Sequence, residues 1–515
     1  MYLPRLLVPL TVASLAACSN AYEVTVYRTS QSGENLVEVE AVIPGDLPLI
    51  QLELDPAQKY QKIYGFGASF TESSAWNLAT VPLDLRKEVM RKLFDPQDGA
   101  GFTLTRTHIN SSDYSNYHYS YVDDGDTELA SFSIAEDMRG FTGDENEQVR
   151  GIALEDPDYD LVPMILEALS VKGADVRIVA SPWSPPSWMK TGETAEMTNG
   201  HLLPEYHGVW AEYLSKYISA YAEQGIDLWA ITPQNEPLHA HDARWDSNGW
   251  TATQARDFLR DHLGPQLVRD GHLDVDDLEA GVRVLIYDHN KGEMNDYVAP
   301  TYADSEASQY AWGTAFHWYA PSQQASSDWH AADLAEHVSR HPDKALIHTE
   351  SSIDIEAGDP IGQYWRKSRD YAGEFVPFDT YAYEIITNMN HGAQGYIEWC
   401  IILSNEGKPN PYDNFNSAPV LINPRTDEVI YTPLYYLLSH FSKFIRPEAK
   451  RIAIEIDEAH EGVIHTAVRN ADGSIVLVAF NRNDEAYLLE IGLKGETYTV
   501  TLAPRAMQTV RFSAP

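Results

Sequence analysis

Short apolar runs alternate with helical segments along the middle of the chain, from about residue 60 to residue 430. Apolar runs bounded by turn residues are typical of buried parallel strands. The clearest helical segment is 210–224, where apolar side chains recur at helical spacing until Gly225 ends the pattern. The apolar runs are 63–70, 102–110, 176–183, 228–236, 282–290, 313–319, 345–350 and 394–399. Strands and helices in this alternation predict a (β/α)8 TIM barrel over residues 60–430.

Both ends of the chain have a different pattern, in which apolar and polar residues alternate one by one. This alternation is present in residues 22–55 and returns in the runs 462–468, 474–480, 486–491 and 498–502. A period of two is typical of strands with one buried face. The fold class that follows is α/β: a barrel with an appended β-sandwich, built from N-terminal strands in 22–55 and from the C-terminal region 431–515.

The predicted barrel strands end in polar or aromatic residues, although their bodies are apolar. The polar ends are 110–113, 181–186, 234–236, 288–290, 317–319, 349–350 and 398–399. In barrels of this kind the chemistry gathers at the carboxyl ends of the strands. We therefore expect these segments to form a ring around one site.

Two glutamates of this ring form the candidate catalytic pair. Glu236 ends the fourth predicted strand and Glu350 ends the seventh, so the two lie on opposing sides of an eight-stranded barrel. Cleavage of a glycosidic bond with retention needs an acid that protonates the departing oxygen and a second carboxylate that attacks the anomeric carbon. We assign Glu236 as acid/base and Glu350 as nucleophile; the placement allows retention and leaves inversion open. Asn235, just before Glu236, is suited to bind a sugar 2-hydroxyl.

Other residue types at the strand ends are suited to different chemistry. Asp288, His289 and His317 could ligate a metal by type, but their spacing matches no recurrent ligand motif. We expect no metal and no cofactor, and we expect His317 to orient a neighbouring carboxylate. Cys400 lies in an apolar run without a paired histidine, which predicts a buried, inert thiol.

Composition narrows the class of substrate. The formal net charge is −39, from 76 acidic and 37 basic residues, and a field of this sign repels nucleic acid and anionic membrane surfaces. It favours neutral substrates. The 12 tryptophans and 30 tyrosines suit a carbohydrate cleft, because flat rings cover the apolar faces of sugars.

The first 18 residues have the pattern of an export signal. Arg5 precedes the apolar stretch 6–15, which is too short to span a bilayer, and small residues follow. The segment 15–18 also resembles a bacterial lipobox, in which Cys18 is lipidated, and Ser19 resembles the pattern sorted to an outer membrane. We expect an exported protein held by a lipid anchor at the bacterial outer membrane, with a plain signal peptide as the alternative. Cys18 and Cys400 are the two cysteines, so no disulfide framework is available.

Longer motifs narrow the resemblance to a family. Asn-Glu-Pro at 235–237, His-Trp-Tyr at 317–319 and Thr-Glu at 349–350 resemble the large clan of retaining barrel glycosidases. Four further motifs resemble glycoside hydrolase family 30, the family of acid β-glucosidase (glucosylceramidase), and together cover the chain from about residue 60 to its end. They are 63–72 (IYGFGASFTE), 110–121 (NSSDYSNYHYSY), 180–190 (ASPWSPPSWMK) and 440–447 (HFSKFIRP).

The resemblance implies a set of side chains that contact glucose. They are Asp113, Trp183, Trp318, Tyr319, Trp399 and Asn414. Two motifs depart from the family: Glu398-Trp399-Cys400 stands where Asp-Trp-Asn is common, and Gly407-Lys-Pro-Asn410 where Gly-Gly-Pro-Asn is common. Both lie near the predicted mouth of the site, so they put the natural substrate in doubt more than the reaction type.

The resulting hypothesis is a retaining β-glycosidase that hydrolyses β-D-glucosides through a covalent glycosyl-enzyme. A β-1,6-glucanase or β-xylosidase activity is the alternative within the family, and a non-catalytic carbohydrate-binding surface lipoprotein is the alternative of another class. The expected partner is a neutral carbohydrate or glycolipid substrate. The membrane is expected to be contacted only through the lipid anchor, and no oligomeric state is predicted.

Overall fold

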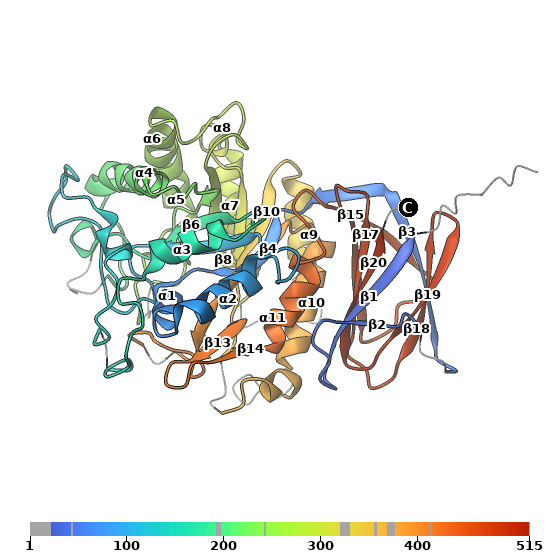
Figure 1. Cartoon of the computed structure of the whole chain (residues 1–515). Coiled ribbons are helices and arrows are strands. Elements are labelled where there is room, and N and C mark those ends of the chain that lie inside the picture. Colours follow the sequence, from blue (N-terminus) through green and yellow to red (C-terminus); the bar gives the residue numbers. More distant parts are fainter. Residues whose placement is uncertain are drawn as a thin grey trace, which may run out of the picture.

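The structure is a computed structural model that describes residues 22–42, 45–145, 147–191, 197–240, 244–319, 330–354, 358–367, 376–412 and 414–513. A helix-wrapped barrel and a β-sandwich lie side by side, and the blue N-terminal strands join the red C-terminal strands in the sandwich (Figure 1). Within the described ranges, no helix is both long enough and apolar enough to cross a membrane.

The barrel is an eight-stranded parallel sheet in the order β4-β11-β10-β9-β8-β7-β6-β5. A parallel bridge between Phe70 and Thr107 brings its two edges together. The strands are β4 (Gly65–Ser69), β5 (Leu104–Ile109), β6 (Arg177–Pro182), β7 (Ala230–Ile231), β8 (Arg283–Asn290), β9 (Gly313–His317), β10 (Ala345–Glu350) and β11 (Gly395–Cys400). All eight predicted strands are present, which confirms the barrel.

Helices cover the outside of this sheet. Helix α4 (His207–Glu223) is the segment predicted at 210–224, and it buries Trp210, Leu214 and Tyr217. The other helices are α1 (Glu72–Ala79), α2 (Leu83–Phe94), α3 (Leu161–Ser170), α5 (Ala252–Phe258), α6 (Gly264–Arg269), α7 (Met294–Ala303), α8 (Ser305–Ser308), α9 (Ala331–Arg340) and α10 (Pro377–Asn390). Strand residues alternate between a small apolar cluster inside the barrel and the larger core beneath the helices.

The sandwich is a nine-stranded sheet in the order β19-β18-β3-β15-β16-β17-β20-β1-β2. Its strands are β1 (Glu23–Ser30), β2 (Val37–Val39), β3 (Leu49–Lys62), β15 (Lys450–Ile456), β16 (Val463–Arg469), β17 (Ile475–Asn481), β18 (Tyr487–Leu493), β19 (Glu496–Leu502) and β20 (Ala506–Ser513). The predicted assembly from both ends of the chain is confirmed, because β1 pairs with β20 and β3 pairs with both β15 and β18. Strands β15 and β20 were not among the predicted runs.

A helix and a small sheet connect the two parts. Strands β12 (Ile402–Ser404), β13 (Val420–Asn423) and β14 (Glu428–Tyr431) form a three-stranded sheet after the barrel. Helix α11 (Pro433–Ser442) then packs on β4 of the barrel and on β1 and β20 of the sandwich. The predicted domain boundary between residues 430 and 431 falls inside β14, two residues before a helix that touches both parts.

Candidate active site

The two predicted catalytic glutamates meet at the carboxyl end of the barrel. Glu350 is the last residue of β10, and Glu236 follows β7 after a short segment. A carboxylate oxygen of Glu236, one of Glu350 and a ring nitrogen of His317 lie within 4.8 Å of one another. Retaining glycosidases place their carboxyl groups about 5–5.5 Å apart, and inverting enzymes leave about 6.5–9.5 Å for a water molecule. The short separation fits retention.

Arg106, from the middle of β5, holds the nucleophile candidate. Its side chain is fully buried and donates through Nη1 to Glu350 Oε2 at 2.5 Å. Its Nη2 donates to Asp288 Oδ2 at 2.8 Å and to Asn235 Oδ1 at 2.7 Å. Charge-assisted hydrogen bonds of this kind fix both distance and direction. Because the amide oxygen of Asn235 accepts from Arg106, its NH2 group is the part that could make the predicted contact with a sugar hydroxyl, and that contact stays a prediction.

His317 links Asp288 to the acid/base candidate. Its Nε2 lies 3.0 Å from Asp288 Oδ1 and its Nδ1 lies 3.3 Å from Glu236 Oε1. Thr349 donates to the same Asp288 oxygen at 2.6 Å, so this carboxylate is held from several sides. The prediction that His317 orients a neighbouring carboxylate is confirmed.

The charges of the site follow from these contacts. Burial favours a raised pKa for Glu236, but His289, whose Nδ1 lies 3.8 Å from Oε1, and the hydrogen-bonded His317 hold the pKa below its ordinary value. Burial raises the pKa of Glu350 against the opposing charges of His317 and Arg106. Burial lowers the pKa of His317, but Glu350 and Asp288 outweigh this and raise it to about 9.

Taken alone, the lowered pKa of Glu236 and the raised pKa of Glu350 would place a shared proton on Glu350 rather than on Glu236. The 2.5 Å contact with the Arg106 guanidinium favours the ionised form of Glu350, so we assign the proton of the site to His317. The Nδ1 atom of His317 that carries this proton lies 3.3 Å from Glu236 Oε1. The proton can therefore pass through the Glu236 carboxyl group to a departing oxygen.

Strained backbone accompanies the functional strand ends. Asn110, Glu236, Tyr287 and Asp288 have φ values of 61°, 46°, 83° and 59°, a region that favours glycine. Such residues cost roughly 1–3 kcal/mol each and persist where the surrounding structure fixes them. The hydrogen bond from Glu236 N to Asp288 O at 2.9 Å joins two of these positions, at the ends of β7 and β8.

Two tryptophans form an apolar wall beside the carboxylates. Trp183 and Trp399 stack with ring centroids 4.9 Å apart, and the Arg106 guanidinium lies 4.7 Å from the centre of the Trp183 ring. Asn414 Nδ2 lies 3.5 Å from Asp113 Oδ2 in the same region. The charges of Glu350 and Glu236 raise the pKa of Asp113 beyond the effect of burial, which places Asp113 near the pair. The structure thus brings these four predicted residues together, and their individual sugar contacts stay predictions.

The two aromatic residues after β9 lie in different surroundings. Tyr319 is near the carboxylates, because Glu350 and Glu236 add to the burial that raises its pKa. Trp318 packs against Tyr381 of α10 at 4.7 Å between ring centroids and is 7% exposed. The sugar contact of Trp318 stays a prediction, and its observed contact is with Tyr381 in the layer beneath the helices.

The motif at the end of β11 that departs from the family, Glu398-Trp399-Cys400, begins with a buried, hydrogen-bonded carboxyl group. Glu398 accepts from Ser351 Oγ at 2.5 Å and from Tyr381 OH at 2.6 Å, facing α10 rather than the barrel interior. Burial raises the pKa of Glu398 to about 8, so the group is largely neutral at pH 7. Cys400 is a free, buried thiol whose pKa burial raises, as expected for an inert side chain. Cys18 lies outside the described residues.

A metal is a further chemical option for Glu236, His317 and Glu350, which could in principle act as ligands together. The guanidinium of Arg106, 2.5 Å from Glu350, places a positive charge where a divalent cation would bind. The donor set therefore suits a proton-transfer and nucleophile pair better than a metal centre.

Arg106 is the functional residue that sequence reasoning missed, and its loss has a measurable consequence. We expect Arg106→Met to lower the free energy of unfolding by about 3–5 kcal/mol, because Asp288 and Glu350 would lose their buried partner. As a positioning residue it should lower kcat more than it raises KM. Urea unfolding and steady-state kinetics measure both effects.

Arg340→Met is the matched control, because its ion pair with Glu336 is about half exposed. It should change the unfolding free energy by less than about 1 kcal/mol. Equal losses in the two variants would contradict the role given to Arg106.

Comparisons with known proteins agree with this geometry. Residues 63–445 match the Glycosyl hydrolase family 30 TIM-barrel domain, and residues 448–510 match the Glycosyl hydrolase family 30 beta sandwich domain. The lysosomal acid glucosylceramidase of Mus musculus is 28% identical over 88% of this chain and 81% of its own. The endo-1,6-beta-D-glucanase of Neurospora crassa is 27% identical over 97% of this chain and 96% of its own. A solved endo-β1,6-glucanase superposes with a TM-score of 0.78 at 26% identity, covering 95% of this chain and 99% of the other.

Proposed function

The chain belongs to glycosyl hydrolase family 30, a family of retaining β-glycosidases, and we propose that it hydrolyses β-D-glucosides in two steps. In the first step Glu350 attacks the anomeric carbon while Glu236 protonates the departing oxygen, giving a glucosyl ester on Glu350. In the second step Glu236 takes a proton from water, which attacks the same carbon and releases glucose with its original configuration. The supporting observation is the Glu236–His317–Glu350 cluster, in which one carboxylate oxygen of each glutamate and a ring nitrogen of His317 lie within 4.8 Å of one another.

The surrounding residues prepare the two carboxylates for different tasks. Arg106 keeps Glu350 ionised and aimed, which a nucleophile requires. His317 keeps a proton next to Glu236, which a general acid requires. A carbohydrate-binding protein without catalysis would have no need for this division, so the geometry supports the enzyme over the alternative of another class.

A β-1,6-linked glucan is the second candidate substrate. It is supported by the Neurospora crassa endo-1,6-beta-D-glucanase, which aligns over almost the whole of both chains. The departure at Glu398-Trp399-Cys400 lies at the same strand end as one wall of the site. Trp399 is the residue of this motif that belongs to the wall, since Glu398 faces α10, and the product profile below distinguishes a small β-glucoside, a glucolipid and a glucan.

A product profile tests the proposed function. The enzyme is incubated with 4-nitrophenyl β-D-glucoside, gentiobiose, β-1,6-glucan, glucosylceramide and 4-nitrophenyl β-D-xyloside. Release of glucose from at least one glucoside, faster than xylose release, is expected. Activity on the xyloside alone, or on none of the five, would contradict the proposal; release of oligosaccharides from β-1,6-glucan would select the endo-acting candidate.

We also propose that a lipid on Cys18 anchors the mature protein at the bacterial outer membrane. The support is the order of Arg5, the apolar stretch 6–15 and the small residues before Cys18. In a Gram-negative host, wild type should partition into the detergent phase of Triton X-114 and Cys18→Ala into the aqueous phase, because the substitution removes the residue that would carry the acyl chains. Cys400→Ala is the control and should partition like wild type; a Cys18→Ala protein in the detergent phase would refute the anchor.

A further inference from the structure

A cavity of about 720 Å³ lies at the end of the barrel opposite the catalytic glutamates. Tyr64, Trp312 and Gln394, which line it, each precede a barrel strand by one residue, and Ala345 is the first residue of β10. The carboxylates lie at the other, carboxyl ends of these parallel strands. The cavity is therefore separate from the catalytic cleft.

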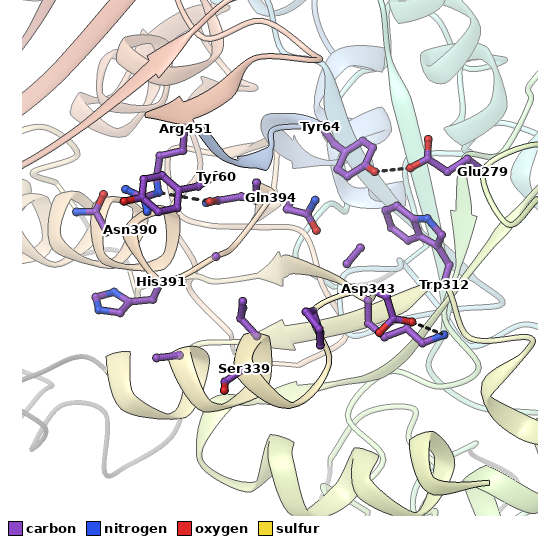
Figure 2. Close-up of a pocket in the computed structure, with 17 residues that line it drawn as sticks. Tyr60, Tyr64, Glu279, Trp312, Ser339, Asp343, Asn390, His391, Gln394 and Arg451 are labelled. Atoms are coloured by element: carbon purple, nitrogen blue, oxygen red, sulfur yellow. Dashed lines mark hydrogen bonds and ion pairs between the residues drawn. The ribbon is translucent and has the colours of Figure 1, made fainter. Parts of the chain in front are cut away.

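Both parts of the molecule contribute to this cavity. The barrel provides its base and the ends of helices α9 and α10, and the sandwich provides Tyr60 of β3 and Arg451 of β15. Figure 2 shows Tyr60 and Arg451 on one side and Tyr64, Glu279 and Trp312 on the other. A pocket of this volume, at a junction between domains, is a common place for a small-molecule or oligosaccharide ligand.

Aromatic rings line two sides of the cavity. Tyr64 and Trp312 lie 5.1 Å apart between ring centroids, and Trp229 supports both rings at 5.2 Å. On the sandwich side, Tyr60 is 41% exposed, and the Arg451 guanidinium lies 3.8 Å from the centre of its ring. An exposed tyrosine held in place by a stacked arginine offers a flat surface for the apolar face of a sugar ring.

The charges that line the cavity are balanced. Glu279 and Asp343 are the acidic residues of the lining, and Lys344 and Arg451 are its basic residues. Lys344 Nζ lies 4.0 Å from Asp343 Oδ2, and Glu279 accepts from Tyr64 OH at 2.8 Å. Both cations already have partners, because Lys344 Nζ donates to two backbone carbonyls and Arg451 Nε donates to Gln61 Oε1 at 3.3 Å. The net charge of −39 repels anions further. This lining suits a neutral molecule with many hydroxyl groups, which the carboxylates can bind as acceptors.

We propose that this cavity is a second carbohydrate-binding site, which takes a neutral β-glucan chain. The class of sugar rests on the proposed function of the catalytic site. Such a site would hold a polymeric substrate on the enzyme between cleavage events and raise the local concentration of chain ends at the cleft.

The test measures gentiotetraose binding by isothermal titration calorimetry to the full chain carrying Glu350→Gln, which prevents turnover. Two binding events are expected. Adding Tyr60→Ala should weaken one event by about two- to tenfold, because the substitution removes the ring on which the sugar stacks. Adding Ser339→Trp, which places a bulky ring in the cavity from the exposed side of α9, should abolish the same event.

Tyr436→Ala is the matched control, a half-buried tyrosine on α11 that does not line the cavity, and it should retain both events. In the active enzyme, Tyr60→Ala and Ser339→Trp should hydrolyse 4-nitrophenyl β-D-glucoside at the wild-type rate. A single binding event that neither change affects would overturn the second site. If the wild-type enzyme hydrolysed no β-glucoside, the proposed function would be contradicted instead. Calorimetry would still measure gentiotetraose binding at this cavity separately.

Discussion

Glu350→Gln is expected to lower kcat/KM by roughly 10⁴-fold or more, because an amide cannot form the glucosyl ester. The loss corresponds to at least about 5 kcal/mol of transition-state stabilisation. The substitution keeps the shape of the side chain, so the stack of Trp183 on Trp399 should be preserved and KM should change little. Steady-state hydrolysis of 4-nitrophenyl β-D-glucoside measures both constants.

Glu398→Gln is the matched control for this variant. Glu398 also lies at the end of a barrel strand, but its pKa is raised to about 8, so the neutral amide resembles the form present at pH 7. Activity within about tenfold of wild type is expected, since its carboxyl binds Ser351 and Tyr381 rather than the reacting atoms. Comparable losses in both variants would argue against Glu350 as the nucleophile.

Glu236→Gln is expected to discriminate between leaving groups. Hydrolysis of a β-D-glucoside with a poor leaving group, such as methanol, should fall about 10²–10⁴-fold, the usual contribution of a general acid. With 2,4-dinitrophenolate, which departs without protonation, the first step should stay fast and the glucosyl-enzyme should accumulate as a burst. The cause is that Glu236 acts in both steps, and only the first can proceed without it.

Azide separates the two glutamates by the configuration of the product. In Glu236→Gln, azide should attack the accumulated ester and give β-D-glucosyl azide, because it needs no general base. In Glu350→Gly, azide should replace the missing carboxylate and give α-D-glucosyl azide. The opposite pair of products would exchange the assigned roles, and an equal loss for both leaving groups in Glu236→Gln would remove its role as acid.

The barrel was predictable because its strands are buried on both faces and read as apolar runs with polar ends. Sandwich strand β20 (Ala506–Ser513) alternates between apolar and polar residues only from Val510 onward, and its first five residues are all buried, so a period of two marks only its second half. β15 carries isoleucines at 452, 454 and 456, but its seven residues have only this short alternation after two basic residues.

The catalytic pair was predictable from the order of the strands, whereas the arginine that holds Glu350 in place was not. Arg106 looks in the sequence like a surface arginine between two threonines. Its function depends on three other strands, which bring Asn235, Asp288 and Glu350 to one guanidinium. Only the closed barrel places them together.

Strand geometry also accounts for Trp318. Side chains alternate along β9, and His317 faces the carboxylates, so the next residue is directed toward α10. The sequence pattern His-Trp-Tyr carries this alternation, which could have separated Trp318 from the neighbouring residues. The positive φ of Glu236 carried no such signal, because no glycine marks the position.

The most direct test of the two-step mechanism is to trap its intermediate. The enzyme is treated with 2-deoxy-2-fluoro-β-D-glucosyl fluoride, whose fluorine at carbon 2 slows hydrolysis of the ester, and the labelled peptide is identified by mass spectrometry. One fluoroglucosyl group on Glu350 is expected, with loss of activity in proportion to labelling. A label on Glu236 or another residue, or α-glucose as the first product from a β-glucoside, would contradict retention through Glu350.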